Sequence, residues 1–288
     1  MSTSSLAPHA FVIGWPIAHS RSPLIHNYWL KMLSLPGSYE QIAVRPEALT
    51  NFLGNFASEG FVGGNVTIPH KESAFALCAG TTPRAKLLRA VNTLWIDGGK
   101  LQGDNTDAAG FLASLDADAP GWDERCEKAV VIGAGGAARS IIAAIMSRSR
   151  CRMTLINRSR ARGLELIELA HAIDPARAIE LLDFSALPDC LAGADLLVNT
   201  TSLGMANQPP LNVDLTPLPD HAVVADIVYV PLETELLTAA RSRGLRTSGG
   251  LGMLLHQAAP GFARWFGVAP EVTPELRALV ARDIAGQS

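Results

Sequence analysis

The chain has 288 residues, of which 48% are hydrophobic and 18% charged, and this length predicts two domains with a sizeable buried core. The net charge of −3 gives no electrostatic argument for nucleic acid or an anionic membrane as a partner, and no apolar run is long enough to span a bilayer. The four cysteines form no CxxC pair and no metal-ligand spacing, so we predict reduced thiols, a cytoplasmic protein and no metal site.

The first predicted strand, residues 11–13, leads into a polar stretch and then into a helix over 24–33. Ser22 is predicted to cap this helix, because Pro23 suits the first helical position. Ser20 and Ser22 are two residues apart, so in an extended segment both hydroxyls face one way and suit a small carboxylate beside the helix. Spacing alone favours the simpler alternative, which is a cap plus a surface serine.

Two further strands are predicted over residues 39–44 and 61–68, with a helix over 46–58 between them. The second of these strands ends just before Lys71, which starts another helix. In open α/β sheets, ligands bind beyond the carboxyl ends of the strands, so Lys71 stands where a site is expected. The alternative is a solvated surface lysine.

A hairpin is the clearest local signal in the first half of the chain. Its predicted strands, 91–96 and 100–103, flank Asp97-Gly98-Gly99, which is typical of a tight hairpin turn. The segment Asp104-Asn105-Thr106-Asp107 then caps the next helix. By position alone, Asp107 is a first-turn acid that favours the helix dipole.

A glycine-rich turn follows the short apolar strand 130–132. Gly133, Gly135 and Ala138 fit the G-x-G-x-x-[GA] spacing of a dinucleotide-binding turn. The first glycine makes the tight turn, the second lets the backbone approach a pyrophosphate, and the small third residue lets the helix pack on the sheet. The alternative is a tight turn without a ligand.

The next predicted strand, 153–156, ends at Asn157 and is followed by three arginines, Arg158, Arg160 and Arg162. An NAD site usually places an acid here for the ribose 2′-hydroxyl, and this chain has none. Guanidinium groups suit a 2′-phosphate, so the pair of turns predicts NADP(H) as cofactor. The alternative, a solvated basic helix start, is disfavoured because cations at a helix N-terminus oppose the dipole.

Beyond this turn, strands and helices alternate regularly, which predicts a doubly wound parallel sheet. The fold class is therefore α/β, with a Rossmann-type domain in the second half and an α/β domain before it. The remaining predicted strands are 178–182, 196–199 and 223–228, and the predicted helices are 160–172, 184–191, 233–243, 249–266 and 273–285.

Several motifs, in this order along the chain, closely resemble the shikimate dehydrogenases of the shikimate/quinate dehydrogenase family. The resemblance covers nearly the whole chain. The motifs are Gly14-Trp15-Pro16-Ile17-Ala18-His19-Ser20-Arg21-Ser22-Pro23, Gly64-Asn65-Val66-Thr67-Ile68-Pro69-His70-Lys71, Ala90-Val91-Asn92-Thr93, Asp104-Asn105-Thr106-Asp107, the glycine-rich turn, Asn157-Arg158-Ser159, and residues 199–205, 226–231 and 249–257.

The resemblance implies reversible reduction of 3-dehydroshikimate to shikimate by NADPH, a step of chorismate and aromatic amino-acid biosynthesis. It implies that Lys71 and Asp107 flank the oxygen that gains or loses a proton. It also implies two sets of binding residues. The substrate set is Ser20 and Ser22, for the carboxylate, with Asn65, Thr67, Asn92, Tyr229 and Gln257; the cofactor set is Gly133, Ala134, Gly135, Gly136, Ala137, Asn157, Arg158, Ser159, Arg162, Ile227 and Gly250.

The resemblance further implies a discontinuous substrate-binding domain, residues 1–106 and 250–288, and an NADP-binding domain, residues 107–249. The expected partner is the small-molecule substrate, with no nucleic acid and no membrane, in a monomer or homodimer. Two alternatives stay open: a quinate or aminoshikimate dehydrogenase of the same family, and a non-catalytic NADP-binding relative. A non-catalytic relative need not retain both Lys71 and Asp107.

Overall fold

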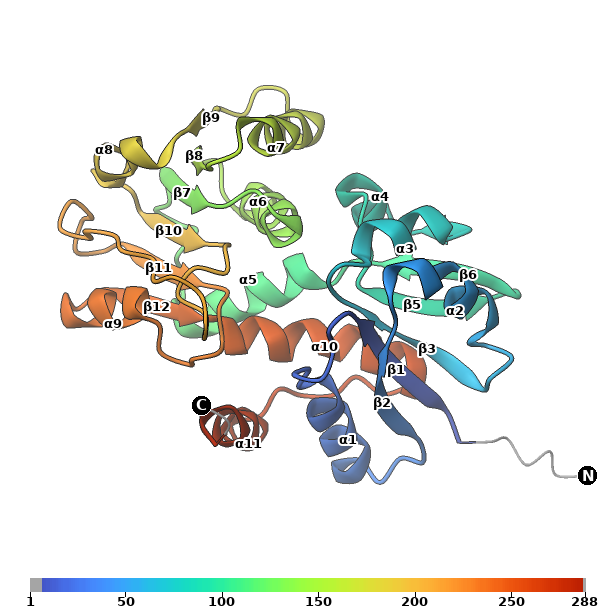
Figure 1. Ribbon diagram of the computed structural model, residues 1–288. Coiled ribbons are helices and arrows are strands. Elements are labelled where there is room, and N and C mark those ends of the chain that lie inside the picture. Colours follow the sequence, from blue (N-terminus) through green and yellow to red (C-terminus); the bar gives the residue numbers. More distant parts are fainter. Residues whose placement is uncertain (1–6, 287–288) are drawn as a thin grey trace, which may run out of the picture. The chain divides into compact units, whose positions relative to one another are not determined.

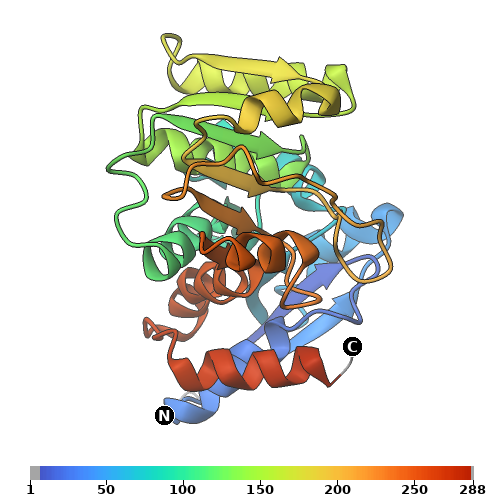
Figure 2. The ribbon, with the colours of Figure 1, turned by 90° about the vertical axis from the view of Figure 1, so that its left-hand side faces the viewer.

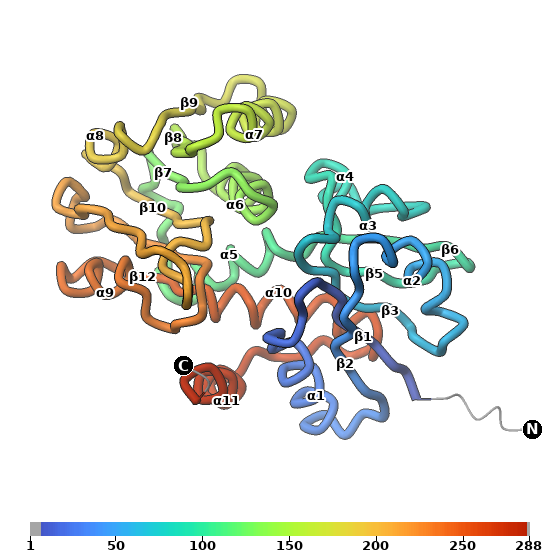
Figure 3. Tube along the Cα trace, viewed as in Figure 1, coloured from blue at the N-terminus to red at the C-terminus, as the bar shows by residue number. Residues whose placement is uncertain are grey.

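A computed structural model describes residues 7–286 of the chain, which divide into two compact units. Unit 1 holds residues 7–106 and Gln257–Val280, and unit 2 holds Asp107–His256 and residues 281–286. The trace in Figure 3 follows the chain from unit 1 into unit 2 after Thr106 and back along one helix, Gly250–Phe266. The boundary predicted at residue 250 is the first residue of that helix, whereas the two units divide within it.

In the described part of unit 1, six strands form one mixed sheet (Figure 1). The strands are β1 (His9–Gly14), β2 (Ser38–Ala43), β3 (Phe61–Val66), β4 (Gly80–Thr81), β5 (Thr93–Asp97) and β6 (Lys100–Asp104). Their order in the sheet is β2-β1-β3-β5-β6-β4. Strand β1 runs parallel to β2 and β3, while β5 runs antiparallel to both β3 and β6. The predicted hairpin is confirmed, because Gly98 and Gly99 join β5 to β6 with φ of +55° and +74°.

Apolar side chains pack the helices of unit 1 onto this sheet. The helices are α1 (Ser22–Met32), α2 (Leu49–Asn55), α3 (Lys71–Leu77) and α4 (Pro83–Leu88), with a 3-10 turn at Pro46–Ala48. Phe11 of β1 is fully buried and meets the rings of Phe52, Phe56 and Phe61 edge-on, at centroid distances of 5.1–5.4 Å. This core fixes the strand ends at which the candidate site lies.

The predicted cap of α1 is wrong by one residue. Arg21 is the N-cap and makes no side-chain cap bond, and Ser22 is already the first helical residue. The Ser22 backbone N–H donates to the Ser20 hydroxyl oxygen at 3.3 Å, so Ser20 satisfies a donor that the helix leaves unpaired.

In the described part of unit 2, six strands form a wholly parallel sheet. The strands are β7 (Lys128–Ile132), β8 (Arg152–Ile156), β9 (Ile179–Leu182), β10 (Leu196–Asn199), β11 (Val223–Asp226) and β12 (Arg246–Gly249). Figure 2 shows them stacked in the order β12-β11-β10-β7-β8-β9. This is the strand order of a dinucleotide-binding Rossmann fold, which confirms the predicted fold class. Strand β12 was not predicted.

Helices cover both faces of the unit 2 sheet. The helices are α5 (Asp107–Asp118), α6 (Gly136–Arg148), α7 (Arg160–Ile173), α8 (Leu187–Leu191) and α9 (Glu235–Ser242), with a 3-10 turn at Phe184–Ala186. Figure 1 shows α6 and α7 on one face and α8 and α9 on the other. Two further helices, α10 (Gly250–Phe266) and α11 (Pro274–Ala285), contain residues of both units.

None of the helices that the structure describes is both long enough and apolar enough to cross a membrane.

Candidate functional site

The loops after β1 and β3 lie side by side at the carboxyl edge of the unit 1 sheet. The Thr67 N–H donates to the Ile13 carbonyl at 2.9 Å, and the Trp15 N–H donates to the Ile68 carbonyl at 3.0 Å. A Cβ at Gly14 would stand 2.6 Å from the Thr67 methyl, so this approach requires glycine. The predicted residues Thr67 and Ser20 therefore belong to neighbouring loops.

Asn92 is the centre of a buried polar network in unit 1. The Asn92 side-chain NH₂ donates to the Gln257 side-chain oxygen at 3.2 Å, and the Asn65 side-chain NH₂ donates to the Asn92 backbone carbonyl at 2.9 Å. The Thr106 N–H donates to the Asn92 side-chain oxygen at 2.9 Å, and the Thr106 hydroxyl donates to the Gln257 backbone carbonyl at 2.8 Å. Three predicted site residues thus share one network, and the bond between Asn92 and Gln257 alone joins positions 165 residues apart in sequence. Thr106 was not predicted as a site residue.

Tyr39 joins two more of the predicted residues and was also missed by sequence analysis. Its hydroxyl donates to the Asn65 side-chain oxygen at 2.7 Å and also hydrogen-bonds with Ser22. Burial raises the pKa of Tyr39, which keeps the phenol protonated and able to donate. Its ring stacks on His26 at a centroid distance of 4.0 Å, and burial lowers the pKa of His26 to about 3, so that imidazole is neutral at pH 7.

Lys71 is the first residue of α3, at the same edge of the sheet. Its backbone carbonyl accepts from the Val91 N–H at 3.0 Å, which places Lys71 beside the segment that leads through Asn92 into β5. The preceding residue, His70, is buried and hydrogen-bonds through its ring nitrogen to the Val44 carbonyl at 2.6 Å, so the start of the helix is anchored. Lys71 itself is half-buried.

Asp107 is the first residue of α5 and belongs to unit 2. It is 5% exposed and follows Thr106, whose side chain and N–H belong to the Asn92 network. The approach of the Asp107 carboxylate to the Lys71 ammonium stays a prediction.

The glycine-rich turn connects β7 to α6 in unit 2. Gly133 has φ of +106°, and a Cβ there would stand 2.7 Å from the Thr200 hydroxyl, so the turn requires glycine. A Cβ at Gly135 or Gly136 would meet nothing within 4 Å, and Gly135 caps α6 without any side-chain bond. Ala134 and Ala137, on either side of these two glycines, are half-buried. The open space beside the start of α6 fits a pyrophosphate, because the first amides of a helix have no partner within it.

The arginine turn lies next to the glycine-rich turn. The Gly133 N–H donates to the Ile156 carbonyl at 2.8 Å, which sets the ends of β7 and β8 side by side. The Asn157 side chain donates to the Ser159 carbonyl at 2.7 Å, and Ser159 precedes α7 without a side-chain cap bond. The three arginines are exposed, and within the described residues they form no hydrogen bond or ion pair: Arg158, Arg160 and Arg162. Unpaired guanidinium groups at an uncapped helix start fit a 2′-phosphate.

Ile227 and Gly250 come together at the same edge of the unit 2 sheet. A Cβ at Gly250 would stand 2.1 Å from the Ile227 carbonyl oxygen, so only glycine fits. Close by in sequence, Asp226 is buried, and its carboxylate accepts from Thr234 at 2.8 Å and Asn199 at 2.9 Å. Burial raises the pKa of Asp226.

Tyr229 lies three residues beyond Asp226 and is half-buried in unit 2. Its predicted contact with a substrate that the unit 1 residues hold stays a prediction.

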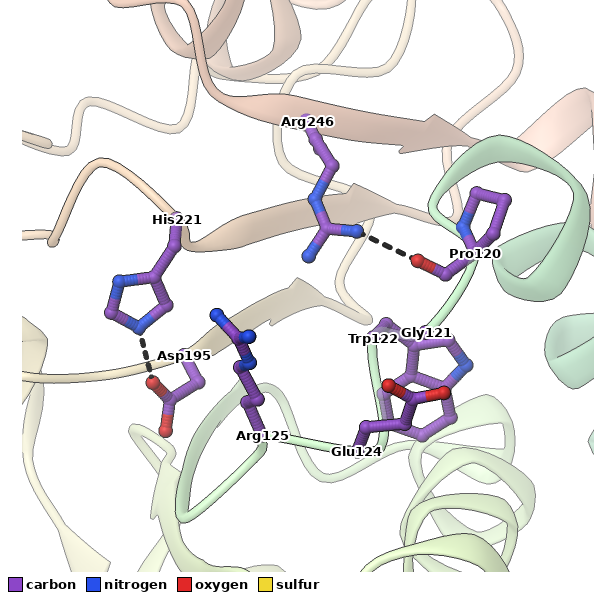
Figure 4. A pocket seen from close by; sticks show the side chains of 8 residues that line it. All are labelled: Pro120, Gly121, Trp122, Glu124, Arg125, Asp195, His221 and Arg246. Atoms are coloured by element: carbon purple, nitrogen blue, oxygen red, sulfur yellow. Dashed lines mark hydrogen bonds and ion pairs between the residues drawn. The ribbon is translucent and has the colours of Figure 1, made fainter.

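A separate cavity of about 320 Å³ opens at the amino ends of the unit 2 strands. Figure 4 shows Asp195, His221 and Arg246, which lie before β10, before β11 and at the start of β12, around it. None of the predicted site residues lines this cavity. The predicted residues described above instead follow the carboxyl ends of strands, each within its own unit, where open α/β sheets bind ligands.

Comparison with known proteins identifies the family. Family models described as "Shikimate dehydrogenase substrate binding domain", "Shikimate / quinate 5-dehydrogenase" and "Shikimate 5'-dehydrogenase C-terminal domain" match residues 12–94, 119–211 and 250–279. A protein of Methylocella silvestris named Shikimate dehydrogenase (NADP(+)) is 59% identical over 281 residues, which are 98% of each chain. This chain belongs to the shikimate dehydrogenase family.

Solved structures of the family share the fold. The shikimate 5-dehydrogenase of Thermus thermophilus, in complex with NADP(H) and shikimate, is 33% identical, with a TM-score of 0.81 over 96% of this chain and 99% of that one. The quinate dehydrogenase of Corynebacterium glutamicum, in complex with NAD, is 29% identical, with a TM-score of 0.88 over 96% and 99%.

Proposed function

We propose that this shikimate dehydrogenase family member catalyses the reversible reduction of 3-dehydroshikimate to shikimate by NADPH, a step of chorismate and aromatic amino-acid biosynthesis. The protein is an oxidoreductase, and its 59%-identical relative carries the name of the NADP-dependent enzyme. The observation that carries the proposal is the Asn92 network. It gathers Asn65 and Gln257 from distant parts of the chain and ends at Thr106, directly before Asp107.

The substrate would be held by hydroxyl and amide groups at the carboxyl edge of the unit 1 sheet. Shikimate is a cyclic polyol with one carboxylate, and amide groups can both donate to and accept from its hydroxyls. Ser20 and Ser22 would bind the carboxylate, where the start of α1 adds backbone donors. The ring hydroxyls would be held by Asn65, Thr67, Asn92, Gln257 and Tyr229.

Lys71 would act as the proton donor and acceptor. In the reducing direction its ammonium protonates the oxygen that develops negative charge, and in the oxidising direction its amine takes the proton back. The Asp107 carboxylate would orient the ammonium and stabilise its charge. The bound nicotinamide supplies the hydride chemistry.

NADP(H) would bind along the carboxyl edge of the unit 2 sheet. The open, uncapped start of α6 suits its pyrophosphate, and the unpaired arginines beside Asn157 suit its 2′-phosphate. The proposed contacts are Gly133, Ala134, Gly135, Gly136, Ala137, Asn157, Arg158, Ser159, Arg162, Ile227 and Gly250.

The competing function within the family is quinate oxidation, because the quinate dehydrogenase of Corynebacterium glutamicum shares the fold with a TM-score of 0.88. That protein was solved with NAD, whereas this chain has arginines and no acid after β8. We expect the fastest rise in absorbance of the reduced nicotinamide with shikimate and NADP, among the four pairings of shikimate or quinate with NADP or NAD. A faster rate with quinate, or with NAD, would overturn the assignment. NADP binding without turnover of any pairing would favour a non-catalytic relative.

We also expect the protein to work in the cytoplasm as a monomer or homodimer. The four free cysteines support a reducing compartment. Light scattering coupled to gel filtration measures the mass directly, and an assembly larger than a dimer would contradict this expectation.

A further inference from the structure

Two of the four cysteines lie together at the amino ends of neighbouring strands in unit 2. Cys126 is two residues before β7, and Cys151 directly precedes β8. Lys128 pairs with Arg152 in the parallel register, and the Arg152 N–H donates to the Glu127 carbonyl at 2.8 Å. Adjacent strands are about 4.8 Å apart, and disulfides join Cα atoms about 4.4–6.8 Å apart. Extended back by one residue, this register sets Cys151 opposite Glu127, so Cys126 and Cys151 are diagonal neighbours on adjacent segments of the chain.

Ser149 fixes this arrangement by bonding to both cysteines. Its hydroxyl donates to the Cys126 carbonyl at 2.9 Å and accepts from the Cys151 N–H at 3.1 Å. The buried guanidinium of Arg177 donates to the Ser149 carbonyl at 2.5 Å and to the Cys151 carbonyl at 3.3 Å. The site thus combines two thiols, the Ser149 hydroxyl that joins the backbones of the two cysteines, and the Arg177 cation.

The two thiols differ in acidity because they interact. The Cys126 thiol donates a hydrogen bond to the Cys151 sulfur, which lowers the pKa of Cys151 to about 7 and raises that of Cys126. The charge of Arg177 also lowers the pKa of Cys151. The other two cysteines behave in the opposite way, because burial raises the pKa of both Cys78 and Cys190. Since the thiolate is the nucleophilic form, Cys151 is the thiol of this pair that is assigned the first attack.

We propose that Cys126 and Cys151 are a modification site, at which a small peroxide forms a disulfide that thiol reductants reverse. The Cys151 thiolate attacks one peroxide oxygen, an S–O bond forms, the O–O bond breaks, and the departing hydroxide takes the proton of the Cys126 thiol to become water. The Cys126 thiolate then attacks the Cys151 sulfur, the S–S bond forms and hydroxide leaves. The two sulfurs are oxidised by two electrons in total, and the peroxide is reduced.

The cavity in Figure 4 brings solvent close to this pair. Arg125, which directly precedes Cys126, lines the cavity together with Trp122. Cys126 and Cys151 are themselves only 7% and 1% exposed, so the proposal requires an oxidant as small as hydrogen peroxide. This inference goes beyond the proposed function and does not depend on it.

The test counts thiols in the full-length protein after treatment with hydrogen peroxide, using maleimide labelling under denaturing conditions and intact mass. We expect two labelled thiols in place of four, a mass lower by two hydrogen atoms before labelling, and four thiols again after dithiothreitol. Proteolytic peptides of the unsubstituted chain should contain Cys126 linked to Cys151. Four thiols that persist, oxygen adducts without a crosslink, or a crosslink through Cys78 or Cys190 would overturn the proposal.

Single substitutions give matched controls. Cys126→Ser and Cys151→Ser should each keep all three remaining thiols as thiols or simple oxygen adducts, with no intramolecular crosslink. Cys190→Ser and Cys78→Ser should each still lose two of three thiols to the crosslink. A crosslink in either of the first two variants contradicts the assignment. If a variant does not fold, the peptide map of the unsubstituted chain still decides, and none of these readouts requires enzymatic turnover.

Discussion

The carboxyl edges of the two sheets hold their polar groups in opposite ways. In unit 1, Asn65 and Asn92 are buried and hydrogen-bonded to each other, to Tyr39 and to Thr106. In unit 2, the glycine-rich turn offers open space, and Arg158 has no partner among the described residues. One edge is organised before any ligand arrives, whereas the other presents unpaired donors and charge. Substitutions at the first should disturb geometry, and those at the second should disturb affinity for an anion.

The largest effect is expected for a substitution of Lys71, because proton transfer depends on this residue and substrate binding does not. Lys71→Ala should lower kcat by about 100-fold or more, since a well-placed general acid–base group contributes roughly 10²–10⁴-fold. Shikimate binding should stay nearly intact, because the amide network of Asn92 is untouched. Steady-state kinetics and equilibrium binding measure the two effects separately.

Lys86, an exposed lysine on α4, provides the matched control, and Lys86→Ala should leave kcat unchanged. Unchanged turnover in Lys71→Ala would refute its role as proton donor.

The glycine-rich turn offers a paired test of backbone geometry against open space. Gly133→Ala must place a Cβ 2.7 Å from Thr200 at φ of +106°, which should cost about 2 kcal/mol of folding free energy or more. Gly136→Ala meets nothing within 4 Å at the first residue of α6 and should change stability by less than about 0.5 kcal/mol. Urea unfolding of both variants measures the two losses of folding free energy. A loss in Gly133→Ala as small as that in Gly136→Ala would show that the turn tolerates a side chain.

A substitution in the arginine turn should weaken cofactor binding by removing a positive charge. Arg158→Ala should raise the KM for NADPH by about tenfold and the KM for NADH much less, because charge-assisted hydrogen bonds contribute roughly 1.5–3 kcal/mol. The effect should shrink at high salt, since the site is exposed and screened. Arg152→Ala, at the exposed opposite end of β8, is the control and should leave both KM values unchanged. An equal loss for NADPH and NADH in Arg158→Ala would remove the 2′-phosphate argument.

The sequence predicted most strands, the hairpin and the Rossmann order because each has a local signal, such as an apolar run or a glycine turn. Strand β12 escaped because Arg246–Gly249 is a short polar segment with no apolar run, and it forms only as the edge of an existing sheet. The cap of α1 was misplaced because the Ser20 hydroxyl takes the Ser22 N–H and the helix begins one residue earlier.

Sequence analysis missed two site residues, Thr106 and Tyr39, because their partners also lie outside the nearby sequence. Thr106 was seen only as part of a helix cap, and its role comes from Asn92 and Gln257, which are 14 and 151 residues away. Tyr39 sits in an ordinary strand, and its partner Asn65 is 26 residues further on. Only the fold brings these pairs together, so no pattern in the nearby sequence reports them.

The smallest effect is expected for a substitution of Tyr39. This substitution tests whether the hydrogen-bond network of unit 1 is formed before the substrate binds. Tyr39→Phe removes the hydrogen bond to the Asn65 side-chain oxygen, worth about 1 kcal/mol, together with the one to Ser22, and should raise the KM for shikimate about fivefold while kcat changes little. Tyr28→Phe on α1 is the control, because the Tyr28 side chain makes no hydrogen bond among the described residues. A purely structural role would instead lower the thermal midpoint and leave KM unchanged. In that case the Asn65 side chain keeps its position without the Tyr39 hydroxyl, through its bonds to Asn92 and Thr93, and Tyr39 is not part of the preformed network.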